Sequence, residues 1–152
     1  MPNERKPGAM RPYNPEDTRK FKRDFFIYES ESLALVAGVS SNDTIQIEAD
    51  SDFILQKLTC HTTLADATYV LQNTPIPNVS LLITDTGSGR QLMNNPIPIP
   101  SFFGNGQLPF ILPNPRKIAK NSVLNIAYTN FDAAQAYSVR LAFIGYKIYE
   151  LA

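Results

Sequence analysis

The chain has 152 residues, of which 43% are hydrophobic and 18% charged, so it is long enough to bury one core of ordinary domain size. Fourteen basic and fourteen acidic side chains give a net charge of zero, which disfavours direct binding of DNA or RNA as the main role. One cysteine and one histidine exclude an internal disulfide and a zinc site of the Cys/His type, and no apolar stretch is long enough to span a bilayer.

The first 24 residues differ from the rest of the chain in charge and proline content. They carry seven basic and four acidic side chains, a net charge of +3, together with four of the twelve prolines. A segment this polar cannot bury enough apolar surface to fold by itself. We therefore predict a flexible basic N-terminal arm over residues 1–24 and a globular domain over residues 25–152.

Two roles are open for this arm. It is either a solvated terminus or a segment that becomes ordered on a partner protein. In the second case its aromatic side chains act as anchors and its basic side chains pair with carboxylates. The arm residues predicted to contact a partner are Arg11, Tyr13, Arg19, Phe21, Lys22 and Arg23.

From residue 25 onward, short runs alternate between apolar and polar side chains, which is typical of half-buried strands. Such runs cover residues 43–49, 53–61, 79–84, 123–129 and 137–143. The clearest run places Tyr137, Val139, Leu141 and Phe143 on one face. No comparable helical pattern is present. We predict an all-β fold, an antiparallel β-sandwich of the jelly-roll type with about seven or eight strands.

The alternation changes near Gly145. Beyond this residue the large apolar side chains occupy even positions, at Ile144, Tyr146 and Ile148, instead of odd ones. A glycine at such a change predicts a β-bulge or a strand that crosses between sheets.

Residues 75–115 hold eight of the prolines and four of the seven glycines. Because proline cannot donate a hydrogen bond to a sheet, we expect loops and edge strands here. Three aromatic residues of this region, Phe102, Phe103 and Phe110, have two interpretations. They either plug one end of the sandwich or form part of a protein-binding face.

The segment 81–90, Leu-Leu-Ile-Thr-Asp-Thr-Gly-Ser-Gly-Arg, resembles the active-site turn of aspartic proteases. The resemblance implies a homodimeric, retroviral-type enzyme in which Asp85 of each copy shares a proton and activates water. Thr84 replaces the apolar residue that usually precedes the aspartate, and Tyr146 replaces the arginine of a second family element near the C-terminus. The alternative is a plain β-turn, since Asp and Gly supply the dihedral angles of a tight reversal.

Other chemistry is poorly supported by the sequence. Cys60 and His61 are adjacent, so on a strand they point to opposite faces and do not form a nucleophile–base pair. The acidic residues between 43 and 52 do not fit the spacing of a calcium loop. We therefore predict no catalytic residues, no metal site and no cofactor.

A longer segment, residues 83–130, resembles the small decoration, or cement, proteins of tailed-bacteriophage heads. The matching elements are Asp-Thr-Gly-Ser-Gly-Arg, Asn-Pro-Ile-Pro, Phe-Gly-Asn-Gly, Leu-Pro-Asn-Pro and Asn-Ser-Val-Leu, which lead into a strand. The resemblance implies a β-sandwich or jelly roll that assembles as a homodimer or homotrimer on the outer surface of a capsid.

The resemblance also implies a function. We expect a structural virion protein, assembled in the host cytoplasm, that cements a capsid by bridging subunits of the major capsid protein. Its partners are then that protein and further copies of itself, without direct contact to nucleic acid or membrane. The alternatives are the aspartic protease described above and a tail or fibre adhesin that contacts a receptor through its Pro/Gly loops.

Overall fold

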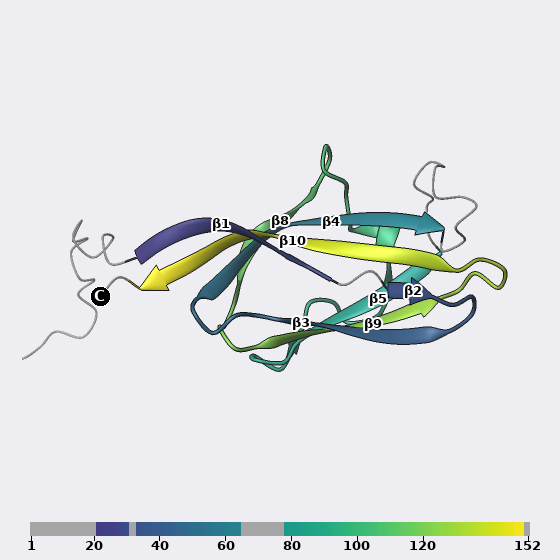
Figure 1. The fold of residues 1–152 in the computed structure, drawn as a ribbon, viewed down its shortest axis with the longest axis horizontal. Helices are drawn as coiled ribbons and strands as arrows, with labels where there is room; N and C mark the ends of the chain where they lie inside the picture. The colour runs from purple at the N-terminus through teal and green to yellow at the C-terminus, as the bar shows by residue number, and fades with distance from the viewer. Residues whose placement is uncertain (1–20, 31–32, 65–77, 151–152) are drawn as a thin grey trace, which may run out of the picture.

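The structure, a computed structural model, describes residues 21–30, 33–64 and 78–150 (Figure 1). Its strands form two antiparallel five-stranded sheets that lie face to face, which confirms the expected antiparallel β-sandwich. The first sheet contains β1 (Phe21–Glu29), β2 (Leu33–Leu35), β4 (Asp52–Leu64), β8 (Phe110–Ile118) and β10 (Tyr137–Glu150). The second sheet contains β3 (Ser40–Gln46), β5 (Val79–Asp85), β6 (Arg90–Gln91), β7 (Ile97–Pro98) and β9 (Val123–Asn130).

The strands pair as a nested series. The outermost pairs join β1 and β2 to β10, the next joins β3 to β9, then β4 pairs with β8, and innermost β5 pairs with β6 and β7. Successive pairs alternate between the two sheets. As a result β10 lies between β1 and β4 in the first sheet, and β9 lies between β3 and β5 in the second.

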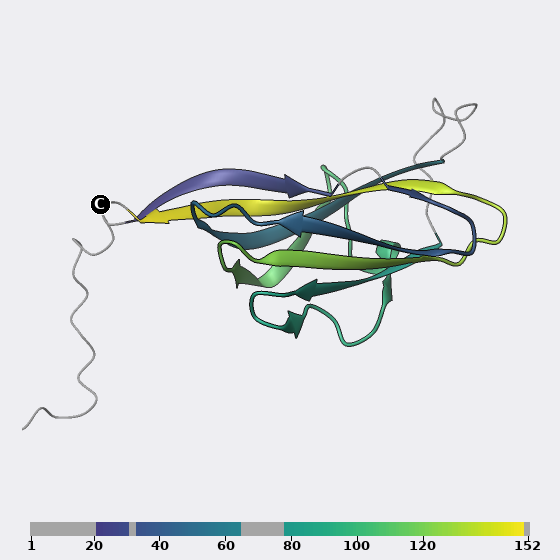
Figure 2. The same ribbon diagram turned by 60° about the horizontal axis from the view of Figure 1, so that its bottom comes forward.

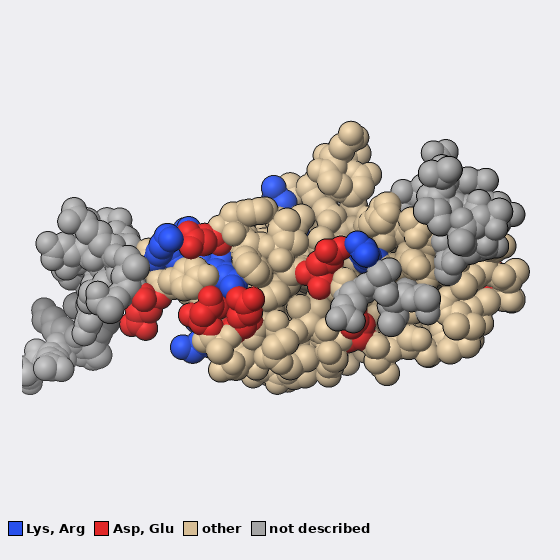
Figure 3. All heavy atoms as spheres, viewed as in Figure 1, with Lys and Arg blue, Asp and Glu red and all other residues tan. Residues whose placement is uncertain are grey.

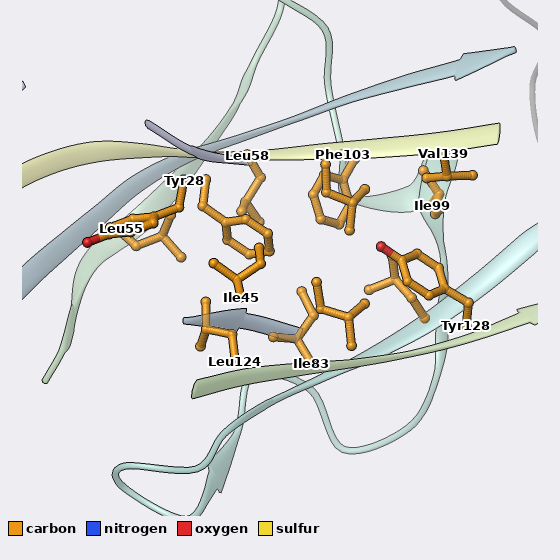
Figure 4. Packing of buried hydrophobic residues seen from close by; sticks show 14 of the residues in the cluster. Tyr28, Ile45, Leu55, Leu58, Ile83, Ile99, Phe103, Leu124, Tyr128 and Val139 are labelled. Carbon is orange, nitrogen blue, oxygen red and sulfur yellow. The ribbon is translucent and has the colours of Figure 1, made fainter. Parts of the chain in front are cut away.

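The inward faces of both sheets form one core, shown in Figure 4. The apolar positions expected to share faces in β5, β9 and β10 are all buried there, as are Ile45 and Ile47. The fully buried residues with the largest side chains include Tyr128, Phe53, Phe143, Leu81, Ile83, Ile126 and Leu141. The alternation of apolar and polar residues therefore predicted correctly which side chains of these strands face the core.

The predicted irregularity at Gly145 is a bulge in the neighbouring strand. Ile144 pairs with Lys57 and Gly145 pairs with Leu55, so Gln56 is an extra residue in β4. A β-carbon on Gly145 would lie 1.8 Å from the carbonyl oxygen of Ile54, so the close approach of β4 requires glycine.

The strand β10 does not change sheet or parity at this point. Gly145 and Lys147 continue its inward face, and the large apolar residues Ile144, Tyr146 and Ile148 lie on the outer face of the first sheet. The change in the sequence pattern therefore marks apolar residues that point away from the core.

The expected boundary between arm and domain, at residue 24, is wrong for residues 21–24. They form the first part of β1, and their partners on β10 run from Glu150 opposite Phe21 to Lys147 opposite Asp24. Figures 1 and 2 show this pair of strands extending beyond the rest of the sandwich. The side chains of residues 21–24 are largely exposed to solvent. This part of β1 therefore lacks the alternation of apolar and polar residues from which a strand is predicted. The remaining arm, residues 1–20, lies outside the described residues.

The prolines of the middle region that lie in described strands occupy sheet edges, as expected. Pro113 and Pro115 lie in β8, the last strand in the order of the first sheet, and Pro98 lies in the two-residue strand β7. A short 3-10 turn, η3 (Ile99–Ser101), follows β7 and buries Ile99.

Replacement of Leu141 by alanine should lower the free energy of unfolding by about 2–5 kcal/mol, because its fully buried side chain would leave a cavity between the sheets. The matched change Arg140→Ala alters an exposed neighbour on the outer face and should cost less than about 0.5 kcal/mol. Denaturant unfolding of both variants measures the difference, and equal losses would contradict the assigned strand faces.

Gly145→Ala should destabilise the protein by about 3 kcal/mol or more, because the new methyl group collides with the backbone of β4. Gly106→Ala serves as the control, since a β-carbon there meets no atom within 4 Å. Thermal unfolding of the two variants should show a large fall in melting temperature for the first and almost none for the second. A small effect at Gly145 would mean that β4 is not held this close.

Candidate functional site

The residues predicted to contact a partner lie in three places. Arg11, Tyr13 and Arg19 fall outside the described residues. Phe21, Lys22 and Arg23 lie on β1, at one edge of the first sheet, whereas Phe102 and Phe103 follow η3, close to the opposite edge formed by β8. The structure therefore does not combine the arm residues and the loop aromatics into one surface.

Phe103 is a core residue and not part of a binding face. Its ring is 9% exposed and lies edge-on to the ring of Phe143, with 6.4 Å between the centroids. Phe102 packs on Phe103, with centroids 4.4 Å apart, and remains half-buried. Of the two interpretations, Phe103 therefore fits the one in which the ring fills one end of the sandwich.

Phe102 lines an open groove of about 690 Å³ between β8 and the segment that joins β6 to β7. Leu92, Met93, Phe110 and Leu112 give the groove apolar walls. Arg90, Arg116 and Lys117 supply positive charge at its sides. The described residues that line it include no histidine, cysteine or carboxylate.

Asp85, the candidate protease residue, is built into the turn that follows β5. Its side chain is 2% exposed, one carboxylate oxygen accepts the N–H of Gly87 at 3.0 Å, and the other accepts the hydroxyl of Ser88 at 2.9 Å. The guanidinium of Arg116 lies 3.8 Å away. These contacts are those of a carboxylate that caps a tight turn, which supports the β-turn interpretation.

The outer face of β1 and β10 is an exposed apolar surface in the described structure. We call it the β1 face and define it as Phe21, Arg23, Phe25, Ile27, Ile144, Tyr146 and Ile148. Phe25 is 72% exposed, Phe21 52% and Ile27 43%. Phe25 lies opposite Tyr146 and Ile27 opposite Ile144, so their side chains form cross-strand pairs.

Arg23 belongs to the same face. Its guanidinium carbon lies 5.3 Å from the centre of the Tyr146 ring, a cation–π contact that leaves the charge in solvent. Of the residues on this face, only Phe21 and Arg23 were expected to contact a partner. Phe25 and Ile27 were missed, although their shared parity with Phe21 was a signal that could have identified them.

A buried lysine holds the opposite side of β1 in place. Lys147 has 3% of its side chain exposed, and its Nζ lies 3.9 Å from the centre of the Phe26 ring. It is paired with Glu48 and lies 3.4 Å from Asp50, two residues of the connection from β3 to β4. Figure 3 shows acidic and basic side chains gathered at this end of the molecule, whereas most of the remaining face in that view is uncharged.

The pKa of Lys147 reflects this environment. Burial by itself lowers the pKa, but the hydrogen bond to Glu48 and the nearby charges, including Asp50, outweigh it and raise the pKa above its usual range. Tyr28 adds a second link, because its hydroxyl accepts the backbone N–H of Glu48 at 3.1 Å. The inner side of β1 is therefore held against the connection from β3 to β4, and the β1 face lies on its outer side.

Little else in the described residues suggests catalysis. Cys60 and His61 lie on opposite faces of β4, as expected, with His61 exposed and burial raising the pKa of the Cys60 thiol. No group of three or more His, Cys, Asp or Glu side chains in the described ranges is arranged to hold a metal ion. None of the helical segments described is long and apolar enough to cross a membrane.

Comparisons with known proteins give no relative for this chain: no protein-family model, no curated protein and no solved structure matches it significantly.

Lys147→Ala should lower the free energy of unfolding by about 1–3 kcal/mol, because it removes the buried cation between Phe26 and the carboxylates. Lys117→Ala is the matched control, since Lys117 is 66% exposed in its pair with Asp52 and should contribute less than about 1 kcal/mol. Denaturant unfolding measures both.

The pH dependence gives a second readout for Lys147. Its folded pKa is higher than the unfolded value, so its contribution is fully present below the unfolded pKa and is lost as the pH rises through the folded one. The difference between wild type and Lys147→Ala should therefore stay constant from about pH 7 to about pH 9. A difference that grows with pH over this range would indicate a folded pKa below the unfolded one and would contradict the raised pKa.

Proposed function

We propose that the protein is a structural component of a virion that binds the outer surface of a bacteriophage capsid and bridges subunits of the major capsid protein. The observation that carries a binding role is the β1 face, on which Phe21, Phe25 and Ile27 are exposed together on a paired strand. Soluble monomers rarely expose contiguous apolar patches unless these bind something. The identity of the partner rests on the resemblance of residues 83–130 to decoration proteins.

The composition of the β1 face supports a protein partner. Aromatic residues and arginine are the side chains that most often dominate the energy of protein interfaces, and this face offers Phe25, Tyr146 and Arg23 together. The anchors also lie on a strand that is paired along its length, so little conformational entropy is lost when they bind.

The strand pairing supports the jelly-roll type of sandwich. Nested pairs that alternate between two sheets, from β1 and β10 outside to β5 and β7 inside, are what two interlocked Greek keys produce. Jelly rolls occur in viral capsid proteins, among others, so this is an argument by analogy of fold.

Residues 1–20 add a second contact in this proposal. They join the domain at Phe21, where the β1 face begins, and they carry the predicted contact residues Arg11, Tyr13 and Arg19. Fully extended, 20 residues reach at most ~70 Å, far enough to contact an adjacent capsid subunit. Two linked contacts bind more tightly than either alone, because the second acts at a high effective concentration.

The geometry of Asp85 gives no support to the aspartic protease alternative. A catalytic dyad needs a carboxylate that faces substrate and the partner aspartate. Here the carboxylate is buried in its own turn and lies against Arg116.

Phe25→Ser should weaken attachment to capsids at least ten-fold, because it removes the most exposed aromatic anchor of the β1 face. Leu108→Ser is the matched control, since Leu108 is 77% exposed but lies in the loop before β8. Both variants and the wild type are titrated onto purified capsids that lack the protein, and occupancy is measured by quantitative mass spectrometry.

Two outcomes would count against the proposal. Identical occupancy curves for Phe25→Ser and wild type would show that the β1 face does not bind the capsid. Absence of wild-type binding to any capsid preparation, together with absence of the protein from purified virions, would overturn the function itself.

A further inference from the structure

We propose that β1 pairs with β1 of a second copy of the chain, antiparallel about a two-fold axis at Phe26, so that the first sheets of two copies form one continuous sheet. The inference names the self-association partner of the proposed function and in that respect rests on it. Its geometry, however, is argued from β1 alone.

In the part of the chain that the structure describes, the backbone groups on the outer edge of β1 pair with no other strand. Within the described ranges β1 pairs with β10 on one side and with no strand on the other. The N–H of Ser30 donates to the carbonyl of Leu141 at 2.9 Å, which fixes the alternation along the strand. Even-numbered residues therefore direct their N–H and C=O groups toward β10, and odd-numbered residues from Phe21 to Glu29 direct theirs toward the open edge.

This edge also lacks the protection found at the opposite edge of the same sheet. There β8 contains Pro113 and Pro115, which remove hydrogen-bond donors. The nine residues of β1 contain no proline, and their register with β10 has no bulge. A long, regular edge with exposed apolar side chains is a template for another strand.

The side chains of β1 are complementary to themselves in one register. With the axis at Phe26, Arg23 lies opposite Glu29 of the second copy, and Phe25 lies opposite Ile27 of the second copy. Directly opposed residues of an antiparallel pair point to the same side, so each ion pair and each apolar contact forms twice on the outer face. If the axis lay at Phe25 instead, Arg23 would lie opposite Ile27 and Glu29 opposite Phe21 of the second copy. Both the Arg23–Glu29 ion pair and the Phe25–Ile27 contact would then be lost.

Both charged residues are available for this pairing. Glu29 is 54% exposed and its present contact, Arg140, is 4.0 Å away, the limit of an ion pair. Arg23 is exposed. Its one described cation–π contact is with the ring of Tyr146. In the paired register the odd-numbered residues would also exchange about eight backbone hydrogen bonds between the copies.

The dimer accounts for how a single domain bridges subunits. Pairing at the edge leaves the outer side of β1 and β10 uncovered, so the two β1 faces join into one apolar strip across the axis. Two linked faces can engage two capsid subunits at once, and each then raises the effective concentration of the other.

The test is the oligomeric state of the full chain, measured by sedimentation equilibrium over a range of concentrations. We expect a dimer for the wild type. Arg23→Glu and Glu29→Arg should each weaken it about ten-fold or more, because each places two like charges opposite each other twice. The double variant Arg23→Glu/Glu29→Arg should recover most of the affinity. Arg90→Glu, the same charge change in β6 of the other sheet, should leave the dimer unchanged.

Melting temperatures near that of the wild type show that each variant still folds, since both side chains are exposed. A wild type that is monomeric or trimeric overturns the inference. Single variants that dimerise like the wild type also overturn it. If the double variant does not recover the dimer affinity, the register with its axis at Phe26 is excluded. A monomer that still binds capsids refutes the dimer but not the proposed function, and a dimer that binds no capsid refutes the function but not the dimer.

Discussion

The structure depends on one constraint, the strict alternation of side chains along the 14-residue strand β10. This strand pairs with β1 and β2 on one side and with β4 on the other, so it sets the register of most of the first sheet. Its inward positions supply Val139, Leu141 and Phe143, all with no exposed surface. Because a shift of one residue would turn every one of these side chains outward, the core fixes β10, and β10 fixes its neighbours.

The same constraint produces the β1 face. Beyond Phe143 the inward positions hold Gly145, which admits the bulged β4, and Lys147, which binds Glu48 at the end of the sandwich. The alternation cannot change, so the apolar residues at Ile144 and Tyr146 must lie on the outer side. Large apolar groups placed there have no role in the core. Their position beside Phe25 and Ile27 is the reason for assigning binding to this surface.

The contrast between Asp85 and Lys147 shows how context decides what a charged residue does. Asp85 lies in a motif that resembles a catalytic one, yet its carboxylate accepts hydrogen bonds from the turn that follows it. Lys147 lies in no motif, yet it is the cation that links Phe26 on β1 to the carboxylates of the connection from β3 to β4. Buried charges of this kind must be paired, and pairing across distant segments is invisible to a local pattern.

The sequence by itself determined the fold class, the inward faces of β5, β9 and β10 and the edge positions of the proline-containing strands, and at Gly145 it predicted either a bulge or a crossing strand. Each of these follows from a local rule: period-two alternation, the missing donor of proline, or the small size of glycine. Only the tertiary structure decided that residues 21–24 form a strand, that Phe103 is buried and that Phe25 lies beside Tyr146. These depend on which strand lies alongside β1 and on what covers the loop after η3. Contacts between residues more than a hundred positions apart are set by the packing of the whole chain, and no local pattern records them.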